Sequence, residues 1–287
     1  MTDTIWTIQG GRVLGPAPFF IAGIVNVTPD SFYDGGSYPA PETAVAHARQ
    51  LVCDGATILD IGGESTRPYA DPVDAPEELD RIMPVIRELA GKPVERHDCI
   101  EVVPAISVDT YKAGVAATAL DAGADIINDV SAFEYDPELL DVLGQYKPGY
   151  VLMHSLGRPE SMQDAPRYDD PVEDICRFFE RKLEQLDKAG VPSDRIVLDP
   201  GIGFGKLLEH NLAILAGVER FTRFGLPVFM GLSNKSLWQG LLGLDVGERG
   251  NATQVGTAAT AMKGAAIHRV HDVRSAMQTL TIVHALA

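Results

Sequence analysis

Eight short runs of apolar and β-branched residues alternate with longer segments of helical character along this chain of 287 residues. Such runs are typical of buried strands, and apolar residues at helical spacing between them predict amphipathic helices. The helical segment before residue 190, for example, ends at Gly190 followed by Pro192, which predicts a helix stop. The eight predicted strands are residues 19–28, 57–62, 104–110, 125–130, 150–155, 195–200, 227–233 and 266–271.

This alternation of strand and helix predicts a parallel sheet covered by helices, in the α/β class. The sheet could be closed as a (β/α)8 TIM barrel or open as a doubly wound sheet. Eight units without a linker rich in Gly, Ser or Pro favour the barrel, as a single domain spanning residues 1–287. Residues 4–15 predict a short N-terminal β-hairpin at the bottom of the barrel, and residues 236–265 are long enough for two helices.

Composition excludes several classes of function. The 24 basic and 40 acidic residues give a net charge of −16, which argues against binding of nucleic acid or of an anionic membrane. No apolar run approaches the ~18 residues of a membrane span, and the N-terminus lacks the features of a signal peptide. The three cysteines include no CxxC pair, so neither a disulfide framework nor a zinc site is expected. We therefore expect a cytoplasmic protein whose partners are small molecules.

Polar side chains occur at or near the carboxyl end of every predicted strand, where a buried barrel strand would otherwise be apolar. In a barrel these ends meet at one mouth, which is where active sites lie. A single Asn or Asp at such a position is more often a turn former or a helix cap. Recurrence in all eight strands instead predicts a shared polar site. The residues are Asn26, Asp60, Asp109, Asn128, His154, Asp199, Lys235, and Arg269 with His271.

Arg269 and His271 predict that the ligand carries an anionic group. They are two residues apart, so in a strand they share a face, and a guanidinium beside an imidazole suits phosphate. The sequence HDVRS begins the last predicted helix, whose first N–H groups would add to an anion site. The alternative role for Arg269 is an ion pair with a carboxylate inside the barrel. We expect the cations to gather at this mouth, on a body that is otherwise acidic.

Two loops on the same side exceed the usual βα connection of about 2–6 residues. They are residues 28–42 and 62–78, and both mix Gly, Pro, Ser and acidic residues as mobile lids do. Arg67 in the second loop could bring a further cation over a bound phosphate. The sequence LDPGIGFGK at 198–206 is not a P-loop, because Leu207 stands where Ser or Thr is required.

Eight motifs, in order along the chain, together resemble the dihydropteroate synthase family. The most specific are NVTPDSF within residues 23–36 and GGESTRP within residues 59–70. The resemblance implies a (β/α)8 barrel, usually a homodimer. It also implies that (7,8-dihydropterin-6-yl)methyl diphosphate is condensed with 4-aminobenzoate to give 7,8-dihydropteroate, with Mg²⁺ assisting. The other motifs are SVDTYK (107–112), IINDV (126–130), LMHSLGRPESMQ (152–163), LDPGIGFGK (198–206), GLSNKS (231–236) and RVHDV (269–273).

The resemblance also implies roles for individual residues, each carried over by its motif. Asp109, Lys235 and Arg67 would take part in catalysis, and Asn26 would help to hold the metal. Asp109 would stabilise the cationic methylene group that remains when diphosphate departs. The pterin would be bound by Asp109, Asn128, Asp199 and Lys235, the diphosphate by Arg269, His271, Asn26 and Arg67, and 4-aminobenzoate by Thr66, Pro68, Phe204 and Ser233.

Two residues depart from the usual pattern of this family. Asn234 stands where the seventh-strand motif commonly has Arg, and Tyr69 replaces a Gly of the second loop. If that Arg supports the diphosphate, either phosphate affinity is lower here or another cation compensates. Three other functions remain open: a pterin-dependent methyltransferase acting on a corrinoid protein, a non-catalytic pterin-binding barrel, and a Schiff-base aldolase that uses Lys235. The joint presence of STRP, the Lys235 motif and RVH favours the synthase.

Overall fold

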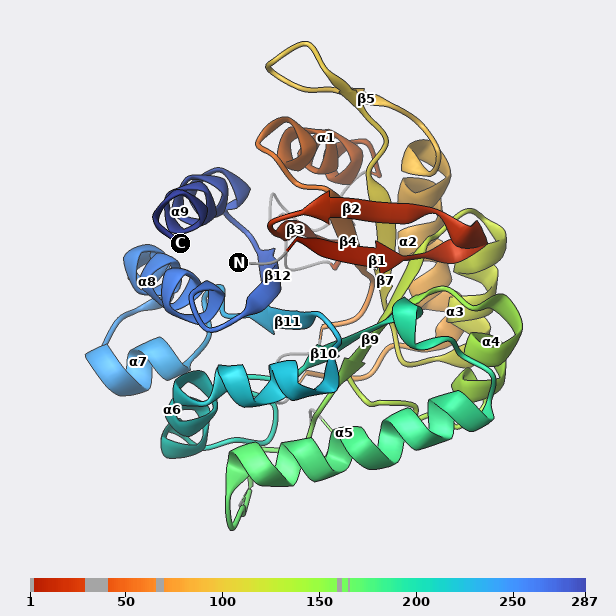
Figure 1. The fold of residues 1–287 in the computed structure, drawn as a ribbon. Helices are drawn as coiled ribbons and strands as arrows, with labels where there is room; N and C mark the ends of the chain where they lie inside the picture. The colour runs from red at the N-terminus through yellow and green to blue at the C-terminus, as the bar shows by residue number, and fades with distance from the viewer. Residues whose placement is uncertain (1–2, 29–40, 66–69, 159–161, 165) are drawn as a thin grey trace.

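The computed structural model describes residues 3–28, 41–65, 70–158, 162–164 and 166–287. Eight parallel strands close into a barrel in the order β10-β11-β12-β3-β4-β7-β8-β9, and helices surround it (Figure 1). The predicted barrel is confirmed, and each predicted strand overlaps a barrel strand, although β9 and β12 begin one residue earlier than predicted. The barrel strands are β3 (Phe20–Asn26), β4 (Ile58–Gly62), β7 (Ala105–Asp109), β8 (Ile126–Asp129), β9 (Gly149–Met153), β10 (Ile196–Asp199), β11 (Val228–Gly231) and β12 (Ala265–Val270).

Three of the described helices, α2, α5 and α9, begin after an Asp whose side chain caps the first turn. Asp170 accepts hydrogen bonds from the N–H groups of Val172 and Glu173, so it caps the helix that starts at Pro171. Two helices, α7 and α8, lie between β11 and β12, as the length of that segment predicted. None of the described helices is long and apolar enough to cross a membrane. The helices are α1 (Pro41–Cys53), α2 (Ala75–Leu89), α3 (Ala113–Asp121), α4 (Leu139–Tyr146), α5 (Pro171–Lys188), α6 (Leu208–Ala216), α7 (Leu237–Leu242), α8 (Gly250–Ala261) and α9 (Val273–Leu286).

The bottom of the barrel is closed by the predicted N-terminal hairpin, whose antiparallel strands are β1 (Thr4–Thr7) and β2 (Val13–Ala17). In Figure 1 these two strands cross in front of the barrel. Trp6 is buried together with apolar side chains from the lower barrel interior, including Phe20 and Ile267. Its indole Nε1 donates to the carbonyl of Arg195 at 2.8 Å. A second small hairpin, β5 (Val94–Glu95) with β6 (Glu101–Val102), precedes β7.

Alternation along each strand determines which side chains reach the mouth. In β3, Phe20 belongs to the lower apolar interior, whereas Asn26, six residues further on the same face, lines a cavity. The strand register then brings the polar ends together. Asp109 lies opposite Asn128 on β8 and opposite Gly62 on β4, and Gly62 lies opposite Asn26. The barrel is therefore apolar below and polar at its carboxyl end.

The turn that follows Asn128 is held by a buried carboxylate, Asp129. Its two oxygens accept hydrogen bonds from the N–H and hydroxyl of Ser131, the N–H of Phe133 and the hydroxyl of Tyr150, at 2.6–2.9 Å. Phe133 has a φ of 54°, and Ala132 before it has a φ of 51°, both in the region that residues other than Gly rarely adopt. Asp129 therefore fixes a strained turn immediately beside a predicted site residue.

Replacement of Asp129 by alanine is expected to destabilise the fold by about 3 kcal/mol or more, because several buried donors lose their acceptor. The free energy of unfolding in urea, measured by circular dichroism, tests this. The control is Asp187→Ala, because Asp187 is exposed on α5 and a surface change is worth about 0.5 kcal/mol or less. Equal stability of the two variants would show that Asp129 does not support the turn.

Candidate active site

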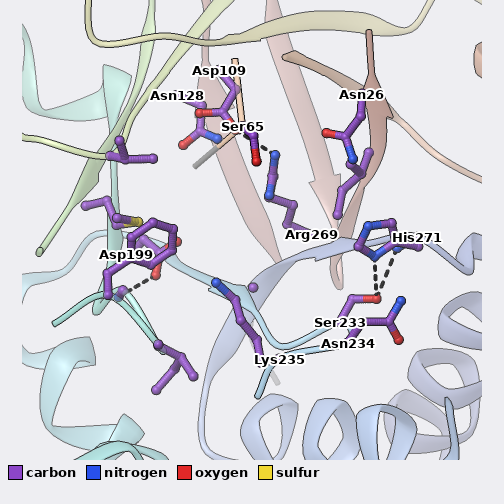
Figure 2. A pocket seen from close by; sticks show the side chains of 18 of the residues that line it. Asn26, Ser65, Asp109, Asn128, Asp199, Ser233, Asn234, Lys235, Arg269 and His271 are labelled. Atoms are coloured by element: carbon purple, nitrogen blue, oxygen red, sulfur yellow. Dashed lines mark hydrogen bonds and ion pairs between the residues drawn. The ribbon is translucent and has the colours of Figure 1, made fainter. Parts of the chain in front are cut away.

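A cavity of about 500 Å³ opens among the carboxyl ends of the barrel strands, and Figure 2 shows its side chains converging from several strands. The residues to which the family resemblance gave a role, and which lie within the described part of the chain, all line it, whereas the predicted strand-end residues Asp60 and His154 do not. Thr66, Arg67 and Pro68, together with Tyr69, lie outside the described residues. The predicted residues that line the cavity are Asn26, Asp109, Asn128, Asp199, Phe204, Ser233, Lys235, Arg269 and His271.

Arg269 on β12 is held between two carboxylates of the barrel interior. Its Nε donates to Asp60 Oδ2 at 2.5 Å, and its Nη2 donates to Asp109 Oδ2 at 2.7 Å. Burial alone would lower the pKa of Arg269, but the charges of Asp60 and Asp109 raise it above its usual value. The ion pair that the sequence left as an alternative for Arg269 is therefore present. Two of the five guanidinium N–H groups are used in these bonds, and the residue also lines the cavity.

Asp60 was predicted to face the mouth, and this was wrong. Its carboxylate does not line the cavity but lies below it, where Ser107 Oγ donates at 2.6 Å and Asn128 Nδ2 at 3.1 Å. The reason is that Asp60 is the central residue of β4, two residues before the strand end, so its side chain lies one layer below the mouth. Asp60 therefore orients Arg269 and Asn128 from below the cavity.

Asp109 has a buried oxygen that no described residue satisfies. Its Oδ1 lacks a hydrogen-bond partner, whereas its Oδ2 is paired with Arg269. Burial raises the pKa of Asp109 to about 7, although the charge of Arg269 opposes this. An unsatisfied buried acceptor is costly unless a ligand donates to it. Asp109 is therefore suited to accept an N–H from a molecule in the cavity.

Asp199 ends β10 and is followed by a turn of left-handed glycines. Its Oδ1 accepts the N–H of Gly201 at 2.7 Å, and burial raises its pKa to about 6. Gly201 has a φ of 67°, and a Cβ there would lie 1.9 Å from the carbonyl oxygen of His154, so only glycine fits. This turn carries Phe204 to the cavity wall.

Lys235 and Phe204 form one wall of the cavity together. The ammonium of Lys235 lies 4.2 Å from the centre of the Phe204 ring, within the range of a cation–π contact. Burial lowers the pKa of Lys235 to about 8, and the charge of Arg269 contributes to the decrease. The wall thus combines a flat aromatic surface with an ammonium group whose pKa is lowered toward neutral pH.

Ser233 and His271 are linked at the other side of the cavity (Figure 2). Ser233 Oγ and His271 Nδ1 are 2.9 Å apart, and the backbone N–H of His271 donates to the same Oγ at 3.3 Å. Asn26 lies on the same side of the view. Asn26 itself lines the cavity.

The described residues offer a metal in this cavity few protein ligands. The described residues contain no group of three or more His, Cys, Asp or Glu side chains that could hold a metal. Mg²⁺, however, often keeps water ligands and relies on substrate phosphates, with one or two protein oxygens. The amide oxygen of Asn26 fits such a partial site.

His154 was also predicted to reach the mouth, and it does not line the cavity. It is buried behind the glycine turn, where its Nδ1 lies 3.0 Å from Lys206 Nζ and its ring packs edge-on against Phe178. Lys206 also donates to the carbonyl of Phe204 at 3.0 Å. Burial lowers the pKa of Lys206 to about 7. These two residues support the turn from outside the cavity.

Two electrostatic expectations also need correction. The first N–H groups of α9 are not all open to an anion, because Asp272 caps the helix and accepts the N–H of Ser275 at 3.0 Å. The mouth is not dominated by cations among the described residues. Three cations and three carboxyl groups line the cavity, namely Lys235, Arg249 and Arg269 with Glu64, Asp109 and Asp199.

The lining residues that the sequence did not predict include Glu64, Ser65 and Arg249, and none of these three ends a strand. Glu64 and Ser65 follow β4, and Arg249 immediately precedes α8. Glu64 stands within the GGESTRP motif, so the motif itself was a signal for it. Arg249 lies in a segment between two helices, and no local pattern in the sequence indicates that its side chain turns into the barrel mouth.

The family comparison agrees with this architecture. The sequence model of a family described as pterin binding enzyme matches residues 22–271, which include every barrel strand apart from the first two residues of β3. The fold, the polar cavity and this match define a barrel enzyme that binds pterins.

Relatives of known activity make the assignment more specific. The dihydropteroate synthase of Escherichia coli strain K12 is 40% identical over 265 residues, covering 92% of this chain and 90% of that protein. The structure of the Yersinia pestis dihydropteroate synthase has a TM-score of 0.88 at 40% identity, covering 100% of this chain and 99% of that one. The Xanthomonas albilineans dihydropteroate synthase with 4-aminobenzoic acid has a TM-score of 0.89 at 39% identity, covering 99% and 98%. The chain belongs to the dihydropteroate synthase family of pterin-binding enzymes.

Proposed function

We propose that this chain condenses (7,8-dihydropterin-6-yl)methyl diphosphate with 4-aminobenzoate, forming 7,8-dihydropteroate and diphosphate in folate biosynthesis. The observation that supports this most is the buried, unpartnered Oδ1 of Asp109 in a cavity that Asn128, Asp199 and Arg269 also line. Such a cavity offers acceptors to a ring edge with N–H donors and a cation to an attached diphosphate.

The pterin ring would be selected by its fixed edge of donors and acceptors. Ionised Asp109 and Asp199 would accept its N–H groups, and Asn128 can both donate and accept. Burial raises the pKa of both carboxyl groups in the free enzyme, whereas hydrogen bonds to the ionised forms lower it again. Ligands that lack this edge would leave buried acceptors unpaired, which discriminates against them by orders of magnitude.

The reaction breaks the bond between the methylene carbon and the diphosphate oxygen, and the electron pair leaves with diphosphate. Arg269 and His271 would stabilise the charge that develops on that oxygen. The methylene group left behind is a cation conjugated with the pterin, and the carboxylate of Asp109 would stabilise it. The amine nitrogen of 4-aminobenzoate then donates its lone pair to this carbon and loses a proton. Because that amine reacts in its neutral form, no strong general base is needed.

Phe204 and Lys235 would provide the surface against which the ring of 4-aminobenzoate lies, with Ser233 beside it. Thr66, Pro68 and Arg67 would complete this subsite and help to exclude water, which would otherwise capture the cation. Lys235 would also contact the pterin, since its ammonium interacts with both Asp109 and Asp199.

We also propose Mg²⁺ as the cofactor, with Asn26 as a protein ligand beside the diphosphate. Bound Mg²⁺ supplies positive charge that neutralises diphosphate oxygens and favours their departure. Asn26→Ala is expected to raise the Mg²⁺ concentration that gives half-maximal rate by about fivefold or more. Asn26→Asp, which supplies a carboxylate oxygen, should restore the wild-type Mg²⁺ requirement at least in part. The Mg²⁺ dependence of the initial rate measures both variants, and an unchanged requirement in Asn26→Ala would remove Asn26 from the metal site.

An assay of diphosphate release tests the proposed function directly. The purified protein would be mixed with Mg²⁺ and the pterin diphosphate, with and without 4-aminobenzoate, and the pterin product would be identified by mass. Release that depends on 4-aminobenzoate and gives dihydropteroate is the expected result. Tight binding of the pterin without condensation would favour a non-catalytic barrel. Transfer of a methyl group from a methylated pterin would instead favour the methyltransferase.

We further propose that the single-domain chain acts as a cytoplasmic homodimer. Exposed apolar side chains on α8 and α9, which pack against each other, support a subunit contact there. Val255, Ile282 and Leu286 are 62%, 60% and 83% exposed. Sedimentation equilibrium would give twice the 30.9 kDa chain mass for the dimer.

A further inference from the structure

Three charged side chains meet beside the part of the cavity wall that follows β4. Lys112, the residue before α3, donates from its Nζ to a carboxylate oxygen of Glu64 and to one of Glu78. Glu64 lines the cavity, whereas Glu78 lies in the first turn of α2 and is completely buried. Lys112 and Glu64 belong to the motifs SVDTYK and GGESTRP, and the proposed function gives neither of them a role. We call these three side chains the Lys112 cluster.

The ammonium of Lys112 keeps its charge in this cluster. Burial alone would lower the pKa of Lys112, but its hydrogen bonds to Glu64 and Glu78 raise it above its usual value. The ammonium also lies 4.6 Å from the centre of the Tyr111 ring. Burial raises the pKa of Glu78, and the hydrogen bond from Lys112 opposes this. Glu78 is therefore a buried carboxyl group that depends on Lys112 for its counter-charge.

Glu64 is held in place by donors from two different segments. Its Oε1 accepts from the hydroxyl of Tyr111 at 3.1 Å, and its Oε2 accepts from Lys112. The same Oε2 accepts the N–H of Val73 at 3.3 Å, from nine residues further along the chain. Glu64 and Val73 stand at opposite ends of the connection between β4 and α2. The carboxylate of Glu64 therefore joins the two ends of this connection and ties them to the segment after β7.

The backbone around the cluster is packed closely on both sides. A Cβ on Gly63 would lie 3.1 Å from the carbonyl oxygen of Glu78, so a glycine lets the end of β4 approach α2. In the barrel, Gly62 lies opposite Asp109 on β7, and Lys112 follows Asp109 by three residues. The Lys112 cluster therefore connects β4, α2 and the segment after β7 at one corner of the cavity.

This corner matters for the second substrate of the proposed function, on which the inference rests. The connection between β4 and α2 carries Thr66 and Pro68, which the proposed function assigns to 4-aminobenzoate. We propose that Lys112 is a positioning residue that fixes both ends of this connection, through Glu64, and so favours binding of 4-aminobenzoate. A binding segment that is held in position before the ligand arrives loses less conformational entropy when the ligand binds, and this raises affinity.

The test uses a double variant, because Lys112→Met alone leaves carboxylates without their counter-charge and destabilises the fold. Lys112→Met combined with Glu78→Gln should unfold at nearly the same urea concentration as Glu78→Gln, which is its reference. In the diphosphate-release assay, the double variant should have a KM for 4-aminobenzoate about tenfold above that of the reference. Its Kd for hydroxymethylpterin, measured by isothermal titration, should change by less than about threefold, because Asn128 and Asp199 reach the pterin from other strands.

Hydrogen exchange gives a second readout, which does not require turnover. The amide of Val73 donates to Glu64, and loss of Lys112 removes the cation that holds this carboxylate. The amide of Val73 should therefore exchange about tenfold faster or more in the double variant than in Glu78→Gln. The amide of Leu198, which donates to the carbonyl of Pro227 on the other side of the barrel, is the internal reference and should not change.

The control is Lys188→Met, because Lys188 is exposed at the end of α5 and pairs there with Glu184. A double variant with the reference KM for 4-aminobenzoate would overturn the proposal. Equal losses of affinity for 4-aminobenzoate and hydroxymethylpterin would also overturn it, since they indicate a general structural role. Absence of diphosphate release by the wild type would instead contradict the proposed function. In that case an unchanged exchange rate at Val73 would still exclude Lys112 as the residue that fixes this connection.

Discussion

Asp109→Ala is expected to lower kcat by at least about tenfold, which corresponds to ~1.4 kcal/mol of transition-state stabilisation. The carboxylate is buried, its Oδ1 faces no partner among the described residues, and its Oδ2 is fixed by Arg269. A charge held in a dry, preorganised position acts more strongly on a developing cation than it would in water. Steady-state release of diphosphate at saturating concentrations of both substrates measures the effect.

The pH dependence gives this prediction a second readout. Stabilisation of a cation requires the ionised carboxylate, so kcat/KM should rise with pH as the free enzyme loses this proton. Burial raises the pKa of Asp109 to about 7 and that of Asp199 to about 6. The wild type should therefore have an acid limb near pH 7. In Asp109→Asn, whose amide does not titrate, the limb should move to about pH 6, where Asp199 titrates.

The control for both measurements is Asp187→Asn, a change on the exposed surface of α5. It should leave kcat and the acid limb as they are in the wild type. An Asp109→Ala variant with wild-type kcat would show that Asp109 does not act on the reacting centre. A reduced kcat with an unshifted acid limb in Asp109→Asn would show instead that another group controls the ionisation.

The fold and most of the described site could be predicted because both depend on local patterns. Alternation directs every second side chain of a barrel strand inward, and at the carboxyl ends of the strands these side chains face the mouth. The polar strand-end residues Asn26, Asp109, Asn128 and Asp199 all reach the cavity for this reason. The same argument failed at Asp60, because position along the strand decides whether an inward side chain lies in the cavity or below it. Asp60 was predicted to face the mouth, but in the structure it is buried and forms an ion pair with Arg269.

Other parts of the site depend on tertiary contacts that no local pattern encodes. His154 follows β9 and was predicted at the mouth, but packing against Phe178 and contact with Lys206 keep it behind the glycine turn. Arg249 reaches the cavity from the start of α8, across the loop that contains Asn234. A sequence motif at 234 shows that a cation is missing there, but only the fold shows that a residue fifteen positions later faces the same wall.

Arg269→Ala is expected to have the other large effect, on both binding and stability. Removal of the guanidinium leaves Asp60 and Asp109 buried without their counter-charge. Breaking one partner of a buried ion pair costs about 3–5 kcal/mol. Thermal and urea unfolding should show this loss in the ligand-free protein. Combining Arg269→Ala with Asp60→Asn removes one of the two unpaired carboxylates and should restore part of the stability.

Binding distinguishes a substrate contact from a purely structural ion pair. If Arg269 binds diphosphate, the stabilised double variant should lose at least about tenfold in affinity for the pterin diphosphate, because a charge-assisted contact to phosphate is lost. Its affinity for the corresponding hydroxymethylpterin, which lacks the diphosphate, should change by less than about threefold. Isothermal titration with each ligand measures both. Because Asp60 also accepts from Asn128, the single variant Asp60→Asn is the required reference. Equal weakening for the two ligands relative to that reference would mean that Arg269 serves only to hold Asp109 in place.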